Sequence, residues 1–146
     1  MTKRIIDLTN KYLADIAVSY IKIHNLHWNV VGPQFKAVHE YLESIYDGYS
    51  EKLDEVAELI RMNGAFPAAS LKEYLELSDI SELDSKEIKV EDAVKELLKN
   101  ISSLRDEAAA IRKDASEEDA FSLVNVLEDH ISGYEKNIWF IESMLK

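Results

Sequence analysis

Four stretches of the chain carry apolar residues at the three- and four-residue spacing that predicts amphipathic helices. Gly32-Pro33 and Asn63-Gly64 disfavour continuation of a helix, so they mark the ends of the first two stretches. In the third, the apolar stripe is Val94, Leu97, Leu98, Ile101 and Leu104. We expect the helices at about Ile5–Asn29, Gln34–Met62, Val90–Lys113 and Glu117–Leu145.

The connections predict how these helices are arranged. Short segments join the first helix to the second and the third to the fourth, so each pair should form an antiparallel hairpin. Residues 64–89 form a much longer connection, in which Ser70 and Glu73 have the spacing of a helix capping box, so we expect a short helix there. Two hairpins and one long crossover describe an all-α, ferritin-like four-helix bundle, a single domain over residues 1–146.

Composition narrows the classes of function. The absence of cysteine excludes disulfides, thiolate metal sites and a catalytic thiol, and it fits a cytoplasmic location. A net charge of −11 without a basic patch disfavours binding to nucleic acid and to acidic membranes, and it favours attraction of cations. No apolar run approaches the roughly 20 residues of a membrane span. The first residues also lack the continuous apolar core of a signal peptide.

His27, His39, Asp54 and Glu58 form the most specific set of chemistry-bearing residues. Imidazole nitrogen and carboxylate oxygen together suit iron or a similar divalent metal. Asp54 and Glu58 lie four residues apart, so they project from one face of the second helix. The two acids alone also fit a solvated helix face with Lys52 and Arg61 nearby.

The spacing of this set indicates a site shared between two chains. His39 precedes Asp54 by fifteen residues, which is about 22 Å along a helix. His27 lies beside the turn, near His39, so one end of the hairpin carries imidazoles and the other carboxylates. Two copies packed antiparallel about a twofold axis would complete two equivalent metal sites. The alternative site inside one bundle uses Glu-x-x-His pairs, and no histidine of this chain has a glutamate three residues before it.

The residues resemble the Dps family, the miniferritins of starved bacterial cells. The stretch from His24 to Gly32, with Phe35, His39 and Glu43, is similar to the first family signature. Leu53-Asp54-Glu55-Val56-Ala57-Glu58, followed by Gly64 and Pro67, is similar to the second. Glu135-Lys136-Asn137-Ile138-Trp139 resembles the motif of the last helix. Together these motifs cover nearly the whole chain.

The resemblance implies a dodecameric cage whose twofold interfaces bind iron at a di-iron or mononuclear site. His27 and His39 would come from one subunit, Asp54 and Glu58 from its mate, and Glu43 would be a further acidic ligand. Iron(II) would be oxidised there, preferentially by hydrogen peroxide, and stored as ferric mineral, which protects against oxidative damage. Trp28 would intercept stray oxidising equivalents. Glu117, Glu118 and Asp119, placed at the start of the fourth helix, would be candidates for an acidic pore.

Two departures from the family pattern qualify this resemblance. The usual arginine after the second-signature glutamate is Leu59 here, and the lysine-rich tail that lets some members bind DNA is missing. The alternative function is that of a DNA-binding nucleoid protein of the same fold. The missing tail and the acidic charge both argue against it. Away from the signatures we interpret His24 and His130 as hydrogen-bonded structural residues. We assign the seven tyrosines no chemistry.

Overall fold

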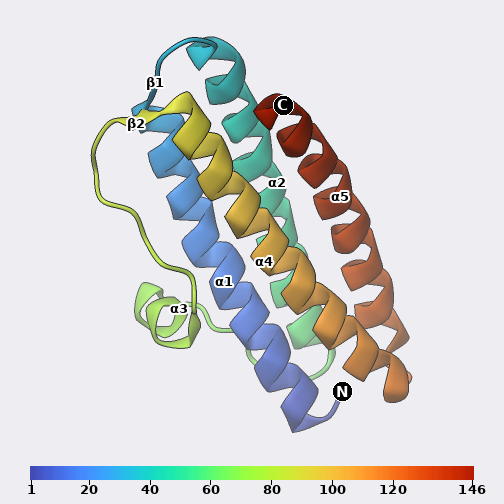
Figure 1. Cartoon of the computed structure of the whole chain (residues 1–146). Helices are drawn as coiled ribbons and strands as arrows, with labels where there is room; N and C mark the ends of the chain where they lie inside the picture. Colours follow the sequence, from blue (N-terminus) through green and yellow to red (C-terminus); the bar gives the residue numbers. More distant parts are fainter.

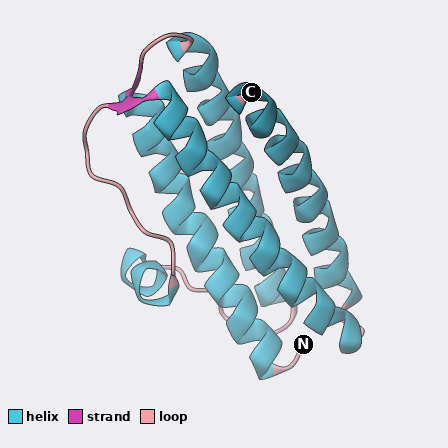
Figure 2. Ribbon diagram, in the orientation of Figure 1, coloured by secondary structure: helices cyan, strands magenta, loops and turns pink.

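The computed structural model describes residues 1–146 and contains four long helices packed as a bundle (Figure 1). A short helix, α3, lies beside them, and two two-residue strands pair in parallel. Helices make up nearly all of the regular structure (Figure 2). The all-α ferritin-like architecture expected from the sequence is confirmed. The elements are α1 (Lys3–Asn29), β1 (Val30–Val31), α2 (Phe35–Met62), α3 (Leu71–Leu77), β2 (Ile88–Lys89), α4 (Val90–Glu117) and α5 (Phe121–Leu145).

The topology is two antiparallel hairpins, α1–α2 and α4–α5, joined by a crossover that runs along the outside of the bundle (Figure 1). The crossover ends at β2, where Ile88 pairs with Val30 and Lys89 with Val31. This pairing, which the sequence pattern did not predict, places the start of α4 beside the α1–α2 turn. No helix is both long enough and apolar enough to span a membrane.

The short helix α3 begins as its sequence predicts. Ser70 Oγ accepts a hydrogen bond from the backbone N–H of Glu73 at 3.2 Å. The Glu73 carboxylate in turn accepts one from the backbone N–H of Ala69 at 2.8 Å. These bonds satisfy amide groups that have no partner within the first turn of a helix. The capping box therefore fixes where the crossover turns into helix.

Polar side chains on α1 hold the crossover against the bundle. The Asn10 side chain accepts a hydrogen bond from the backbone N–H of Ala68 at 2.7 Å, and Asn25 donates to the carbonyl of Leu83 at 3.1 Å. Between them, buried Asp15 accepts from the Ser78 hydroxyl at 2.7 Å and the Asp79 N–H at 2.9 Å. A long connection without much secondary structure is thereby ordered along its length.

Asp15 also belongs to a charged cluster between α1 and α4. Lys11 Nζ lies 2.7 Å from Asp15 and 3.3 Å from Glu107. Burial, followed by the hydrogen bond and charge of Asp15, raises the pKa of the Glu107 carboxyl to about 8. Hydrogen bonds from Glu107, Lys11 and Ser78 outweigh burial and lower the pKa of Asp15. Near neutral pH, a protonated Glu107 thus donates to an ionised Asp15.

We expect Glu107 to make the protein less stable as the pH rises from about 4.5 to about 8. In this range the folded chain holds a proton on Glu107 that the unfolded chain, with the ordinary value of 4.5, has released. The loss should reach at most about 1.4 kcal/mol per pH unit. Glu107→Gln should flatten the profile, because its amide donates to Asp15 at every pH. Melting temperatures measured against pH at one protein concentration test this.

Asp106→Asn is the matched control for this measurement, because Asp106 is a neighbouring acid on α4 whose side chain is 72% exposed. It should keep the wild-type slope. The lowered pKa of Asp15 changes stability only below about pH 3.8, outside the pH range of this measurement. Equal slopes in wild type and Glu107→Gln would contradict the assignment of the proton to Glu107.

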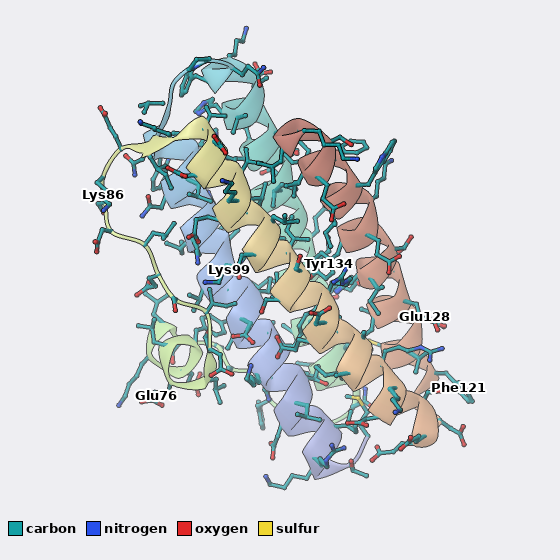
Figure 3. The ribbon with its side chains drawn as sticks, viewed as in Figure 1. Glu76, Lys86, Lys99, Phe121, Glu128 and Tyr134 are labelled. Atoms are coloured by element: carbon teal, nitrogen blue, oxygen red, sulfur yellow. The ribbon has the colours of Figure 1, made fainter.

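The core between the helices is mainly aliphatic, and every buried polar side-chain atom has a hydrogen-bond partner. Leu59, the residue after the second-signature glutamate, is buried in this core. Phe121 and Glu128 project outward from α5, whereas Tyr134 lies within the core (Figure 3). The buried polar residues are Thr9, Asp15, Ser19, Lys22, His27, Asn100 and His130.

The boundary between the last two helices differs from the prediction. Glu117 is the last residue of α4, and α5 begins only at Phe121. Asp119 takes a left-handed conformation, with φ of 55°, that turns the chain between the helices. The expected place of Glu117, Glu118 and Asp119 at the start of the fourth helix is therefore wrong. No breaker precedes this turn, so α4 continues, and Glu118 instead accepts a 2.8 Å hydrogen bond from the Thr2 hydroxyl.

Candidate metal centre

The α1–α2 turn brings His27 and His39 together. His27 lies in the last turn of α1, and His39 lies near the start of α2. Gly32, with φ of 116°, and Gln34, with φ of 68°, occupy the left-handed region and reverse the chain. The two imidazole rings stack with centroids 3.7 Å apart and planes 14° from parallel. The expected proximity of the two histidines is confirmed.

Reciprocal hydrogen bonds fix the tautomer of each imidazole. His27 Nδ1 lies 2.7 Å from the carbonyl oxygen of His39, and His39 Nδ1 lies 2.7 Å from the carbonyl oxygen of His27. A carbonyl only accepts, so each Nδ1 carries the hydrogen, and in a neutral ring each Nε2 keeps a free lone pair. No other hydrogen bond of the chain engages either Nε2. Each ring therefore leaves its Nε2 available as a possible metal ligand.

Aromatic and acidic side chains surround this pair. Glu43, one turn after His39 on α2, is exposed and accepts a hydrogen bond from the Tyr46 hydroxyl at 3.2 Å. The Tyr46 ring meets the His27 ring edge-on at 5.3 Å. Trp28 is 66% exposed, directly after buried His27. Its oxidisable indole lies at the surface, with its ring centroid 5.3 Å from that of His24.

His24 has the structural role expected from the sequence. Its Nδ1 lies 2.6 Å from the carbonyl oxygen of Tyr20, one turn earlier on α1. Its ring stacks on Tyr46 at 3.7 Å. Sequence reasoning did not identify Tyr46 as a neighbour, although its position seven residues after His39 places it two turns along the same face of α2. His24 therefore packs against Tyr46, whose ring in turn contacts His27.

Asp54 and Glu58 are exposed on α2 and have no hydrogen bond or ion pair within the chain. The basic residues that could have neutralised them point elsewhere. Lys52 Nζ lies 5.3 Å from the Tyr134 ring centre, and the Arg61 guanidinium lies 4.5 Å from the ring centre of Phe66. The two carboxylates therefore form an uncompensated negative patch rather than an ion-paired surface.

The imidazoles and the carboxylates do not meet within one chain. His39 and Asp54 lie on the same straight helix, about 22 Å apart by its rise per residue. No group of three or more histidine or acidic side chains in the subunit is arranged to hold a metal ion. The two pairs of candidate ligands expected from the sequence therefore lie toward opposite ends of the α1–α2 hairpin.

Comparisons with known proteins agree with this architecture. The ferritin-like domain family matches residues 6–146. The DNA protection during starvation protein 2 of Bacillus anthracis is 34% identical over 99% of both chains. The structure of antigen TpF1 from Treponema pallidum superposes with a TM-score of 0.96 at 34% identity, covering 98% of this chain and 92% of that one.

A third relative carries a chemical description. The Dps protein of Vibrio cholerae O1, described as a member of a broad superfamily of ferritin-like diiron-carboxylate proteins, has a TM-score of 0.94 at 28% identity. It covers 99% of this chain and 90% of that one. The fold defines a ferritin-like protein, and two of these three relatives are named as DNA-protection or Dps proteins. The chain belongs to the Dps group of the ferritin-like family.

Proposed function

We propose that the protein binds iron(II) at sites shared between two subunits, oxidises it with hydrogen peroxide and stores the ferric product in a dodecameric cage. Iron is the substrate and cargo of this reaction. The main support is that the candidate ligands fall into two pairs at opposite ends of the hairpin. His27 and His39 are preset for a cation at one end of the hairpin, and Asp54 and Glu58 are unneutralised at the other.

The chemistry of the two half-sets fits iron in both oxidation states. Neutral imidazole nitrogens suit iron(II), and anionic carboxylate oxygens suit the harder iron(III). An isologous contact would join the His27 end of one copy to the Asp54 end of a second copy, and symmetry would make this contact twice. Glu43, exposed one turn from His39, would supply a further carboxylate.

The reaction assigns a role to each side of the site. Two iron(II) ions each give one electron to one peroxide, whose oxygen–oxygen bond breaks and whose oxygens leave as water after taking up protons. Pairing the electrons avoids release of hydroxyl radical. We propose that Trp28, exposed beside His27, donates an electron to oxidants that escape this pairing. The net charge of −11 would draw iron(II) to the cage.

The relatives named for DNA protection raise a second function, direct binding to DNA. The charge of this chain argues against it, because affinity for DNA comes largely from basic residues that displace counterions from phosphates. The chain has 17 basic against 28 acidic residues. We propose that any protection of DNA acts through removal of iron(II) and peroxide.

The proposed function is tested with the apo protein, iron(II) and hydrogen peroxide. We expect ferric absorbance to rise faster than in buffer and the iron to remain with the protein. Native mass measured before and after loading should correspond to a dodecamer that gains iron. Oxidation no faster than in buffer would refute the activity. Fast oxidation by isolated subunits would refute the shared site.

A further inference from the structure

A chain of three hydrogen bonds runs from the centre of the bundle to the surface of α2. The hydroxyls of Tyr134 and Tyr12 lie 2.7 Å apart, and the Tyr12 hydroxyl lies 2.9 Å from Nδ1 of His130. His130 Nε2 lies 3.0 Å from a carboxylate oxygen of Glu55. Both tyrosines are 0% exposed and His130 is 2% exposed. Tyr134 lies inside the bundle in Figure 3.

Glu55, the acceptor at the surface end of the network, fixes the direction of all three hydrogen bonds. The Glu55 carboxylate only accepts, so His130 carries its hydrogen on Nε2. Burial and the charge of Lys52 lower the pKa of His130 to about 4, partly offset by Asp129, so the ring is neutral and Nδ1 is bare. Tyr12 must therefore donate to Nδ1, and Tyr134 must donate to Tyr12. Tyr12 thus has a base positioned at its phenolic proton.

A second buried tyrosine of the same bundle has no such base. Tyr49 is 2% exposed and donates to the side-chain oxygen of Asn100 at 2.8 Å. Asn100 donates onward to the Ser19 hydroxyl. An amide oxygen satisfies a hydroxyl but takes up no proton near neutral pH. The two networks satisfy their buried groups equally well, so hydrogen bonding alone does not account for a histidine beside Tyr12.

The network ends beside the proposed metal ligands. Glu55 directly follows Asp54 and precedes Glu58 by three residues on α2. Its side chain is 49% exposed, so the hydrogen-bond chain reaches the surface on the turn that bears both acids. The buried tyrosines thereby lie at the level of the bundle where oxidation would take place.

We propose that Tyr12 is a reversible one-electron donor to strong oxidants, with Nδ1 of His130 as the acceptor of its phenolic proton. The oxidant takes one electron and is reduced, the O–H bond of Tyr12 breaks, and an N–H bond forms on His130. The products are a neutral tyrosyl radical and an imidazolium paired with Glu55. The hydrogen bond from Tyr134 stabilises the radical oxygen. One iron(II) restores the phenol by giving an electron and becoming iron(III), while the proton returns from Nδ1.

Of the buried tyrosines Tyr12 and Tyr49, only Tyr12 has a base positioned to accept its proton in this step. An oxidised phenol is a strong acid, and leaving its proton in place in the core would bury an uncompensated charge. This inference rests on the proposed function only for the source of the oxidant, a radical formed when iron(II) meets peroxide without pairing. A test with an iron-free oxidant therefore separates the two.

Pulse radiolysis of the metal-free protein with azide radical provides that test. Azide radical should oxidise the exposed Trp28 and Trp139, which are 66% and 65% exposed. We expect the tryptophanyl absorption to decay as a tyrosyl absorption rises, with a slower rise in deuterium oxide. Tyr12→Phe should remove the tyrosyl signal of the buried network, leaving any signal from half-buried Tyr46, whose hydroxyl donates to Glu43. His130→Gln should slow the rise of the Tyr12 signal about ten-fold or more. Freeze-quenched samples give the matching electron paramagnetic resonance spectrum.

Tyr49→Phe is the matched control, since it removes an equally buried hydroxyl whose partner is not a base. It should leave the rate and yield of the signal unchanged. A wild-type protein without the transfer, an unchanged signal in Tyr12→Phe, or equal losses in Tyr12→Phe and Tyr49→Phe would each overturn the proposal. Should Tyr12→Phe fail to fold by circular dichroism, the wild-type isotope effect and His130→Gln decide. A tyrosyl signal that rises at the same rate in deuterium oxide and in His130→Gln would refute proton transfer to His130.

Discussion

Two inactive variants should recover activity when they are assembled together. The imidazole-free variant carries His27→Ala and His39→Ala, and the carboxylate-free variant carries Asp54→Ala and Glu58→Ala. Each alone should oxidise iron(II) at the rate of buffer, because every shared site lacks half of its ligands. In a mixed twofold pair, one site has lost both halves and the other is complete. Random assembly from equal amounts should therefore restore about a quarter of the sites.

Co-expression with tags of different mass, followed by native mass spectrometry, establishes that mixed assemblies have formed. The initial rise of ferric absorbance per subunit then measures the recovered sites. The same variants mixed after separate assembly should stay inactive, which controls for residual activity. Mixed assemblies that remain at the buffer rate would contradict a shared site. Substantial activity of either parent alone would show that one half-set suffices.

The long helices were predictable because each carries its own repeating apolar pattern. The nearness of His27 and His39 also followed from sequence, since both flank one short turn. Their reciprocal hydrogen bonds did not, because these depend on the backbone angles of Gly32 and Gln34. The two-residue strands were missed because such short segments have no periodicity to detect.

Interactions between distant elements depend on registers that the sequence does not show. Tyr12 and His130 are 118 residues apart, and they meet only because packing aligns α1 with α5. His130 is hydrogen-bonded, as expected, but the sequence did not identify its partners. The role that we propose for Tyr12 lies beyond a sequence pattern for the same reason. The late start of α5 depended on Asp119, a non-glycine residue in the left-handed region.

Removing the buried carboxylate of Asp15 should release the crossover from α1. Asp15→Ala leaves the Ser78 hydroxyl, the Asp79 N–H and Lys11 Nζ without their shared acceptor. Lys11 is one-third exposed and keeps Glu107 and Asp79 as partners, so the main cost is the lost acceptor of partly buried donors, about 1–3 kcal/mol of stability. We expect a lower melting temperature and fast cleavage within residues 64–89. Limited proteolysis with mass spectrometry locates the cuts, and both measurements use one subunit concentration.

Asp79→Ala is the matched control, because Asp79 pairs with the same lysine at 3.0 Å from a side chain that is 81% exposed. An exposed ion pair contributes at most about 1 kcal/mol, so this variant should melt and resist proteolysis nearly as wild type does. Asp15→Asn separates charge from shape, since its amide oxygen still accepts from Ser78 while the attraction to Lys11 is lost. Its stability should fall between the other two. Equal behaviour of Asp15→Ala and Asp79→Ala would mean that Asn10 and Asn25, rather than Asp15, hold the crossover on α1.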